Sequence, residues 1–174
     1  MINGLSAKDI ISHLELNPHP EGGFYKETYR SDGTIGENSL PENMKGSRTY
    51  ATSIYYLLRT QDSSAFHRIK SDEIWHFHGG DPLEIFEIDE DENLVITILG
   101  SNILDNEKLS YIVVANRWFA ARPANSYNTA GYSLVSCGVA PGFDPQDFEM
   151  ADLNDVKPVI DRNPSLADLI IQHN

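Results

Sequence analysis

Basic residues are scarce in this sequence. It has 13 Lys and Arg against 26 Asp and Glu, which gives a formal net charge of -13. Proteins that bind nucleic acids neutralise the phosphates with clustered lysines and arginines. The basic residues here are few and scattered, so we expect no nucleic-acid partner and no anionic membrane surface. The acidic balance still permits an anionic ligand that is held by a few local arginines.

Cysteines and long hydrophobic runs are also lacking. Cys137 is the only cysteine among 174 residues, so no internal disulfide can form, which is typical of a reducing compartment. No apolar run approaches the roughly 20 residues of a membrane span. The N-terminal residues show no basic region followed by an apolar core. We therefore expect a cytoplasmic protein. Because Cys137 falls in a predicted strand, we interpret its thiol as buried and inert.

Strand patterns dominate the rest of the chain. Many short segments with strand-forming residues follow one another without helices between them, which favours an all-β antiparallel sandwich or barrel. The sequence predicts a single domain over residues 1–174, with the barrel at about 20–150. Ser6 and Asp9 resemble a capping box and predict a helix over about 6–16. Asn163-Pro164 predicts a second helix over about 164–172.

The segment 31–47 is rich in Gly, Asn, Ser and Pro and is long for a loop in a compact domain. We interpret it as a lid, or as an arm that crosses to a partner subunit. Gly22 and Gly23 lie ahead of a predicted strand, where they can adopt positive φ.

The most informative stretch is 64–80, which holds three of the six histidines, His67, His76 and His78. Alternate side chains of a strand point to the same face. One predicted face consists of Glu73, Trp75 and Phe77. The other face consists of Ile74, His76 and His78. A carboxylate and an imidazole on neighbouring strands, beside aromatic rings, indicate a small-molecule pocket.

The spacing of His67, Glu73 and Gly80 resembles the first sequence motif of the cupins, with Ile69 in place of the second histidine of that motif. Further strings extend the resemblance over roughly residues 20–150. They are PEGGFY, ATSIYYLL, DEIWHFHGGDPL, RWFAARP and VAPGFD. Together they resemble the fifth cupin family, long carried as a domain of unknown function. The resemblance implies a double-stranded β-helix, or jelly-roll cupin barrel, with short helices at both ends.

Cupins often hold a divalent metal with three histidines and one glutamate. In the stretch similar to the second cupin motif, Asn116 falls at the glycine and Phe119 at the histidine. Two of the four ligands that the resemblance implies are therefore missing, and we expect no tightly bound metal cofactor. A weaker alternative is a loosely held divalent metal. Its ligands would come from His67, Glu73, His76 and His78.

Proton transfer is the main chemical hypothesis for His67 and Glu73. Histidine titrates near neutrality, and a carboxyl group buried beside apolar rings has a raised pKa, so either can act as acid or base. The alternative is that the two side chains only bond to each other, or to a strand edge, and tie the sheet together. Other candidate ligand-binding residues supply rings or a guanidinium. They are Arg48, Tyr50, Tyr56, Trp75, Phe77 and Trp118.

Three functions remain open. The first is a metal-independent epimerase or isomerase acting on a small sugar- or nucleotide-like ligand, as in sugar epimerases of similar fold. The second is a non-catalytic binding or sensor protein, and the third is a metal-dependent oxygenase. Tyr50, Tyr56 or Tyr132 could supply a second acid or base, and Arg48 or Arg122 could anchor an anion. We expect His13, His19 and His173 at the surface. We also expect a homodimer, because an open sandwich leaves strand edges to cover.

Overall fold

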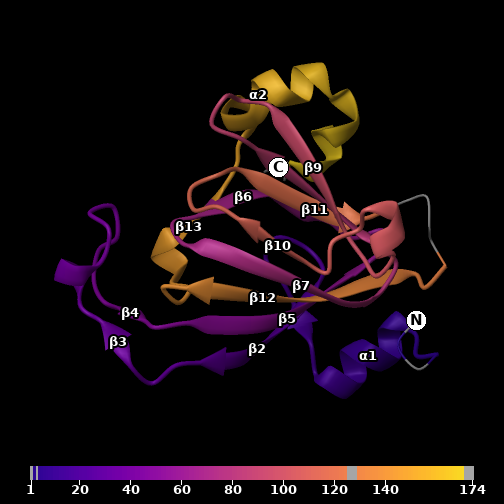
Figure 1. Cartoon of the computed structure of the whole chain (residues 1–174), viewed down its shortest axis with the longest axis horizontal. Coiled ribbons are helices and arrows are strands. Elements are labelled where there is room, and N and C mark those ends of the chain that lie inside the picture. Colours follow the sequence, from indigo (N-terminus) through magenta and orange to yellow (C-terminus); the bar gives the residue numbers. More distant parts are fainter. Residues whose placement is uncertain (1, 3, 125–128, 171–174) are drawn as a thin grey trace.

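Two antiparallel sheets form the body of the molecule in the computed structural model, which describes residues 2, 4–124 and 129–170 (Figure 1). The six-stranded sheet has the order β1 (Asn17–Pro18), β2 (Phe24–Arg30), β5 (Thr52–Arg59), β12 (Tyr132–Ala140), β7 (Asp72–Gly80) and β10 (Ser110–Val113). The five-stranded sheet has the order β13 (Phe148–Met150), β6 (Ser64–Ile69), β11 (Phe119–Pro123), β8 (Leu83–Ile88) and β9 (Leu94–Leu99). This arrangement confirms the all-β jelly roll expected from the strand patterns.

The main core lies between the inner faces of the two sheets. It contains Leu58 from β5, Trp75 from β7, Ile85 from β8 and Phe119 from β11. These residues alternate with outward-facing ones, as strand geometry requires. Burial along β7 follows the predicted alternation, since Glu73 and Trp75 are buried while His76 and His78 are exposed. The predicted inner face is therefore confirmed.

Helices cover both outer faces. Helix α1 (Ala7–Leu14) begins with the capping box of Ser6 and Asp9 and packs Ile10 against Leu57 and Tyr132 of the six-stranded sheet. Helix α2 (Leu153–Arg162) packs Val156 and its neighbours on the outer face of the five-stranded sheet, at the top of Figure 1. None of the described helices has the length and apolar character needed to cross a membrane.

The C-terminal region differs from the expectation of one helix over 164–172. Pro164–Leu169 forms a 3-10 helix, residues 171–172 lie outside the described part, and the regular helix α2 precedes both. Pro158 lies inside α2, where an internal proline removes a hydrogen bond. The capping box of Asp152 and Asp155 and the buried side chains of Val156 and its neighbours offset that loss.

The segment 31–47 leads into an arm at the left of Figure 1, built from β3 (Thr34–Ile35), a short 3-10 helix (Glu37–Ser39) and β4 (Arg48–Thr49). A buried ion pair ties the arm to the rest of the chain, with Arg48 Nε 2.6 Å from an oxygen of Asp147. Two further 3-10 helices complete the list of elements, Ile103–Asp105 and Pro145–Asp147.

Candidate functional site

A cavity of about 220 Å³ lies between the sheets and is lined mainly by the inner face of the six-stranded sheet. Strands β2, β5, β7 and β12 form one wall, β6 forms the other, and the loops before β2 and after β12 close the ends. Four of the predicted site residues line it together: His67, Glu73, Tyr56 and Trp75.

His67 is held in one tautomer by its own strand. The side chain is fully buried on β6, and its Nδ1 lies 2.8 Å from the backbone oxygen of Ala65. A carbonyl oxygen only accepts hydrogen bonds, so Nδ1 carries the proton and Nε2 presents a lone pair. Burial lowers the pKa of His67, although the nearby Glu73 raises it in part. The neutral ring is thus prepared to accept a proton at Nε2.

Glu73 faces His67 from the opposite sheet. The sequence placed these residues on neighbouring strands, but β6 and β7 belong to different sheets and only follow each other in the chain. Burial raises the pKa of Glu73 to about 7, because its charged form is desolvated. His67 opposes this rise, and the second carboxyl group of the cavity, Glu21, adds to it.

Glu21 is the functional residue that the sequence analysis missed. It is only 8% exposed, and its Oε2 accepts a hydrogen bond of 2.7 Å from Ser64 Oγ. The same Oε2 lies 3.4 Å from Nε2 of His67. Burial raises the pKa of Glu21 to about 7, against the opposing effects of His19 and the Ser64 hydroxyl group.

Two glycines bring Glu21 into the cavity. Gly22 and Gly23 have φ of 115° and 69°, which confirms the expected positive φ. A Cβ atom at Gly22 would lie 2.1 Å from the backbone oxygen of Ser63, so only glycine fits this approach. The signal was present in the string Pro20-Glu21-Gly22-Gly23, where the glutamate precedes a turn that only glycines can make.

His19 lies in the cavity wall, which corrects its expected surface position. Its side chain is 16% exposed, and its Nδ1 accepts a 3.2 Å hydrogen bond from the backbone N–H of Glu21. Nδ1 is also 3.9 Å from the Glu21 carboxylate oxygen. Burial lowers the pKa of His19. Two imidazoles therefore flank one carboxyl group, and His67 in turn interacts with Glu73.

Aromatic rings form the wall beside these groups. The ring centroid of His19 is 4.6 Å from that of Tyr25 and 5.1 Å from that of Tyr56. Tyr56 lies 6.0 Å from Trp75 and donates a 2.8 Å hydrogen bond to the backbone oxygen of Gly22. No acceptor among the described residues lies within hydrogen-bond distance of the buried indole N–H of Trp75, although this N–H is near enough to Glu73 to lower the pKa of that carboxyl group in part. A bound ligand with an acceptor oxygen would satisfy the indole N–H.

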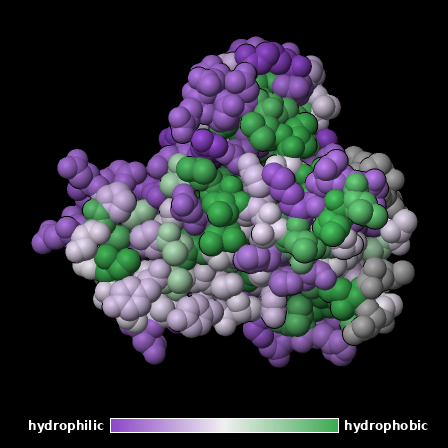
Figure 2. Space-filling view, in the orientation of Figure 1, coloured by the Kyte–Doolittle hydropathy of each residue, from purple (hydrophilic) through white to green (hydrophobic). Residues whose placement is uncertain are grey.

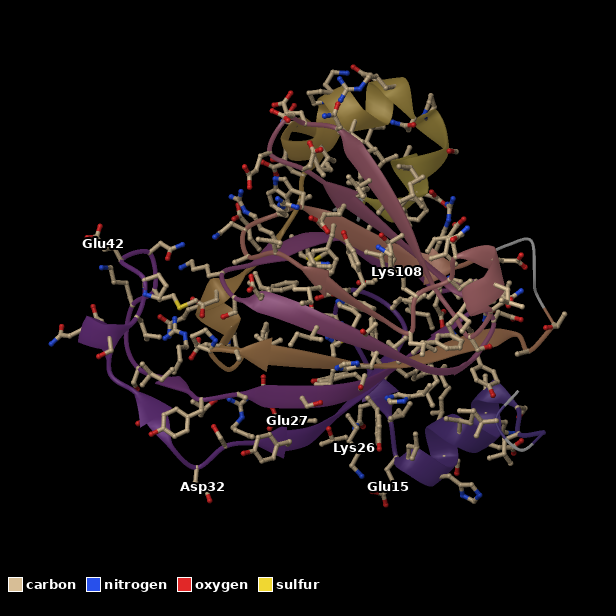
Figure 3. The ribbon with its side chains drawn as sticks, viewed as in Figure 1. Glu15, Lys26, Glu27, Asp32, Glu42 and Lys108 are labelled. Atoms are coloured by element: carbon tan, nitrogen blue, oxygen red, sulfur yellow. The ribbon has the colours of Figure 1, made fainter. Side chains whose placement is uncertain are left out.

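At the mouth, a β-bulge places Arg30 next to Glu27. The register of β2 against β5 shifts between Glu27 and Tyr29, so Glu27 and Arg30 lie on the same face of the strand although they are three positions apart. Arg30 contacts both carboxylate oxygens of Glu27, at 3.0 and 2.6 Å. Lys26 points away and pairs with Glu15, beside which it lies in Figure 3.

The other predicted ligand-binding residues do not line this cavity. Arg48 is buried in its pair with Asp147, and Tyr50 is 57% exposed beside Gly33. Phe77 packs at the edge of the main core. Trp118 packs on the α2 side of the five-stranded sheet, with the guanidinium of Arg68 4.2 Å from its ring.

The residues that could supply a second acid or base, or anchor an anion, also lie outside the cavity, apart from Tyr56. Tyr132 packs against α1, and Arg122 pairs with Glu84 at 3.3 Å.

The cavity does not fit a resident metal ion. Phe119 pairs with His67 in the sheet, and its ring centroid lies 4.1 Å from the imidazole, so an apolar ring occupies the corner where the resemblance implies a histidine. Ile69 lines the cavity in place of the other histidine. His76 and His78 are exposed on the outer face of β7. Within the described ranges, no three His, Cys, Asp or Glu side chains are grouped to hold a metal.

Together, the two antiparallel sheets and the enclosed site between them define a cupin-fold protein. The chain belongs to DUF985, a family of the cupin superfamily, and the model of this family matches residues 8–151.

Solved structures agree with this assignment. A hypothetical protein from Leishmania major is 32% identical with a TM-score of 0.83, over 97% of this chain and 100% of that one. A protein from Shewanella oneidensis is 32% identical with a TM-score of 0.81, over 98% and 99% of the two chains. A variant of oxalate decarboxylase from B. subtilis is 15% identical with a TM-score of 0.53, over 86% of this chain and 34% of that one, and shows the fold alone. No curated protein matches the sequence.

Proposed function

We propose that this cupin is a metal-independent enzyme of the epimerase or isomerase type, which moves a proton on a small sugar- or nucleotide-like ligand. One observation carries the proposal: two buried carboxyl groups with pKa values of about 7, Glu21 and Glu73, flank the fixed imidazole of His67. Groups that titrate near the working pH are the most effective general acids and bases.

The roles follow from the tautomer and the distances. Nε2 of His67 has the lone pair that accepts a proton from the ligand. Glu21 Oε2, 3.4 Å away, stabilises the imidazolium that results. Glu73 interacts with His67 from the other sheet, and in its neutral form it can return a proton to the ligand. Two carboxyl groups that repel each other do not ionise together easily, so one of them stays protonated near pH 7.

The size of the cavity limits the ligand. At about 220 Å³ it lies below the roughly 300–1,000 Å³ of most small-molecule sites. A single ring fits this volume better than a complete sugar nucleotide. Tyr56 and Trp75 offer faces on which such a ring can stack.

The test starts with a thermal-shift screen of sugars, amino sugars and nucleosides. A ligand at 100 times its dissociation constant stabilises the folded state by about 2.7 kcal/mol. Each hit is then incubated with the protein in D₂O, and the loss of a C–H signal is followed by proton NMR. Enzyme-dependent exchange at one carbon is the expected result.

His67→Asn keeps a similar shape without the titrating group, so exchange should slow by roughly 10²–10⁴-fold while affinity changes little. The control is His76→Asn, the same change at an exposed histidine on the outer face of β7. Equal exchange rates in the two variants would rule out the proton-transfer role. A hit that binds without any exchange would favour a binding or sensor protein.

A further inference from the structure

The charged groups around the cavity are unbalanced. Three carboxyl groups line it, Glu21, Glu27 and Glu73, whereas Arg30 is the single lysine or arginine in its lining. Arg30 is engaged by both oxygens of Glu27 and also donates to the backbone oxygen of Phe143 at 3.3 Å. Among the described residues, no lysine or arginine therefore compensates the two inner carboxyl groups, and only the imidazoles of His19 and His67 oppose their charges.

The rings supply a second feature that points in the same direction. Tyr25, His19, Tyr56 and Trp75 follow one another along the wall, with centroids 4.6, 5.1 and 6.0 Å apart. The faces of Trp and Tyr attract cations, and groups of such rings recognise organic ammonium ions. Trp75 additionally offers its buried N–H, which also interacts with Glu73, to an acceptor of the ligand.

We infer that the ligand of this cavity is a small organic cation: a compound with a quaternary or protonated nitrogen, a hydroxyl or carbonyl oxygen, and no phosphate. The nitrogen lies between the aromatic wall and the carboxyl groups of Glu21 and Glu73, and the oxygen accepts from Trp75. This inference uses the site of the proposed function and narrows its ligands to those with an amino group or a protonated ring nitrogen.

Phosphate fits the cavity poorly. A phosphate group is normally held by arginine, lysine or backbone N–H groups. Arg48 and Arg122, the arginines that the sequence offered for an anion, are paired with Asp147 and Glu84 outside the cavity. A phosphate inside would face two carboxyl groups without a free cation.

A cationic ligand also removes the cost of ionising the inner carboxyl groups. Glu21 is faced by His19, by Ser64 and His67 of β6, by the carboxyl group of Glu73, and by the neutral phenol of Tyr56 and thiol of Cys137. Glu73 is faced by His67, Glu21, Tyr56, Trp75 and Cys137. None of these neighbours carries a permanent positive charge, so a bound cation is expected to displace protons from the two glutamates.

The test uses three probes of one shape: choline, its neutral isostere 3,3-dimethylbutan-1-ol, and the anion 3,3-dimethylbutanoate. Each is titrated calorimetrically, up to 20 mM, into the full-length protein after dialysis against EDTA. Choline should bind at least tenfold more tightly than the alcohol, and the anion should not bind. Choline cannot titrate, so its affinity reports the protein alone. If one carboxyl group with a pKa of about 7 must ionise, the affinity rises about tenfold between pH 6 and pH 8.

Matched variants locate the effect. Glu21→Gln and Glu73→Gln should each weaken choline binding about tenfold and flatten its pH dependence. Glu42→Gln, the same change at an exposed residue of the arm, should alter neither. Two variants are used because a failure of one to fold leaves the other informative.

The inference is overturned if choline does not bind, if the alcohol or the anion binds as tightly, or if choline binding does not depend on pH. The titrations need no turnover. Exchange in D₂O that persists with neutral or anionic ligands would thus refute the ligand class alone, while cation binding without exchange would refute only the catalytic role.

Discussion

Glu21→Gln should stabilise the folded protein in alkaline solution. The pKa of Glu21 rises from 4.5 to about 7 on folding, because the carboxyl group is buried. At 1.36 kcal/mol per pH unit, ionising this buried group costs about 3 kcal/mol of stability above pH 7. The neutral carboxyl group makes its full contribution to the free energy of unfolding below pH 4.5. This contribution is lost as the pH rises through 7. Glutamine keeps the shape and accepts from Ser64, yet carries no charge.

The free energy of unfolding of Glu21→Gln, minus that of the wild type, should therefore grow with pH. We expect a difference near zero at pH 4 that rises to about 3 kcal/mol at pH 8.5. The charge of Glu21 also raises the pKa of Glu73, so its removal acts in the same direction. Urea denaturation at several pH values measures the difference, with Glu42→Gln at the tip of the arm in Figure 3 as the control. A difference that is the same at all pH values would refute the assigned burial of this carboxyl group.

The remaining predictions concern other parts of the molecule. Arg48→Ala should cost about 3–5 kcal/mol of stability, because it leaves the buried Asp147 unpaired, while ligand affinity is unchanged; a loss of affinity at unchanged stability would instead place Arg48 in the site. Tyr56→Phe should cost about 1 kcal/mol in urea denaturation by removing the hydrogen bond to Gly22, and an unaltered midpoint would contradict that bond. Light scattering at micromolar concentration should give twice the mass of the chain. The edge strands β9 and β10 expose apolar side chains such as Ile96 and Ile112, and a hydrophobic patch over β10 is visible in Figure 2. A monomeric mass would count against dimerisation.

The sequence predicted the parts of the site that local periodicity controls. The alternation from Glu73 to Phe77 set which side chains point inward, and the spacing of His67 and Glu73 identified their shared cavity. Glu21 could not be found this way, because it enters from a loop and reaches His67 across 46 positions of the chain. The sequence indicated Glu21 only through the two glycines that follow it, because the turn that they form has no room for a side chain.

Arg48 shows the opposite error. The guanidinium of Arg48 suggested an anion site. In the structure this group is paired with Asp147, which is 99 residues away and which no local sequence pattern reveals. Helix α2 was missed because Pro158 contradicts helix propensity, while burial of Val156, Val159 and Ile160 against the sheet decides the outcome. Tertiary contacts determine both results.

The bulge in β2 makes chain length, and not only residue identity, a determinant of ligand charge. Thr28 is the additional residue that sets Arg30 beside Glu27. Inserting one residue between Tyr29 and Arg30 would move Arg30 one position further along β5 and turn the guanidinium to the opposite face of the strand. Glu27 would then lose its counterion, and the entrance would become more acidic without any substitution. Family members that differ by one residue at this point would therefore select ligands of different charge while keeping identical inner walls.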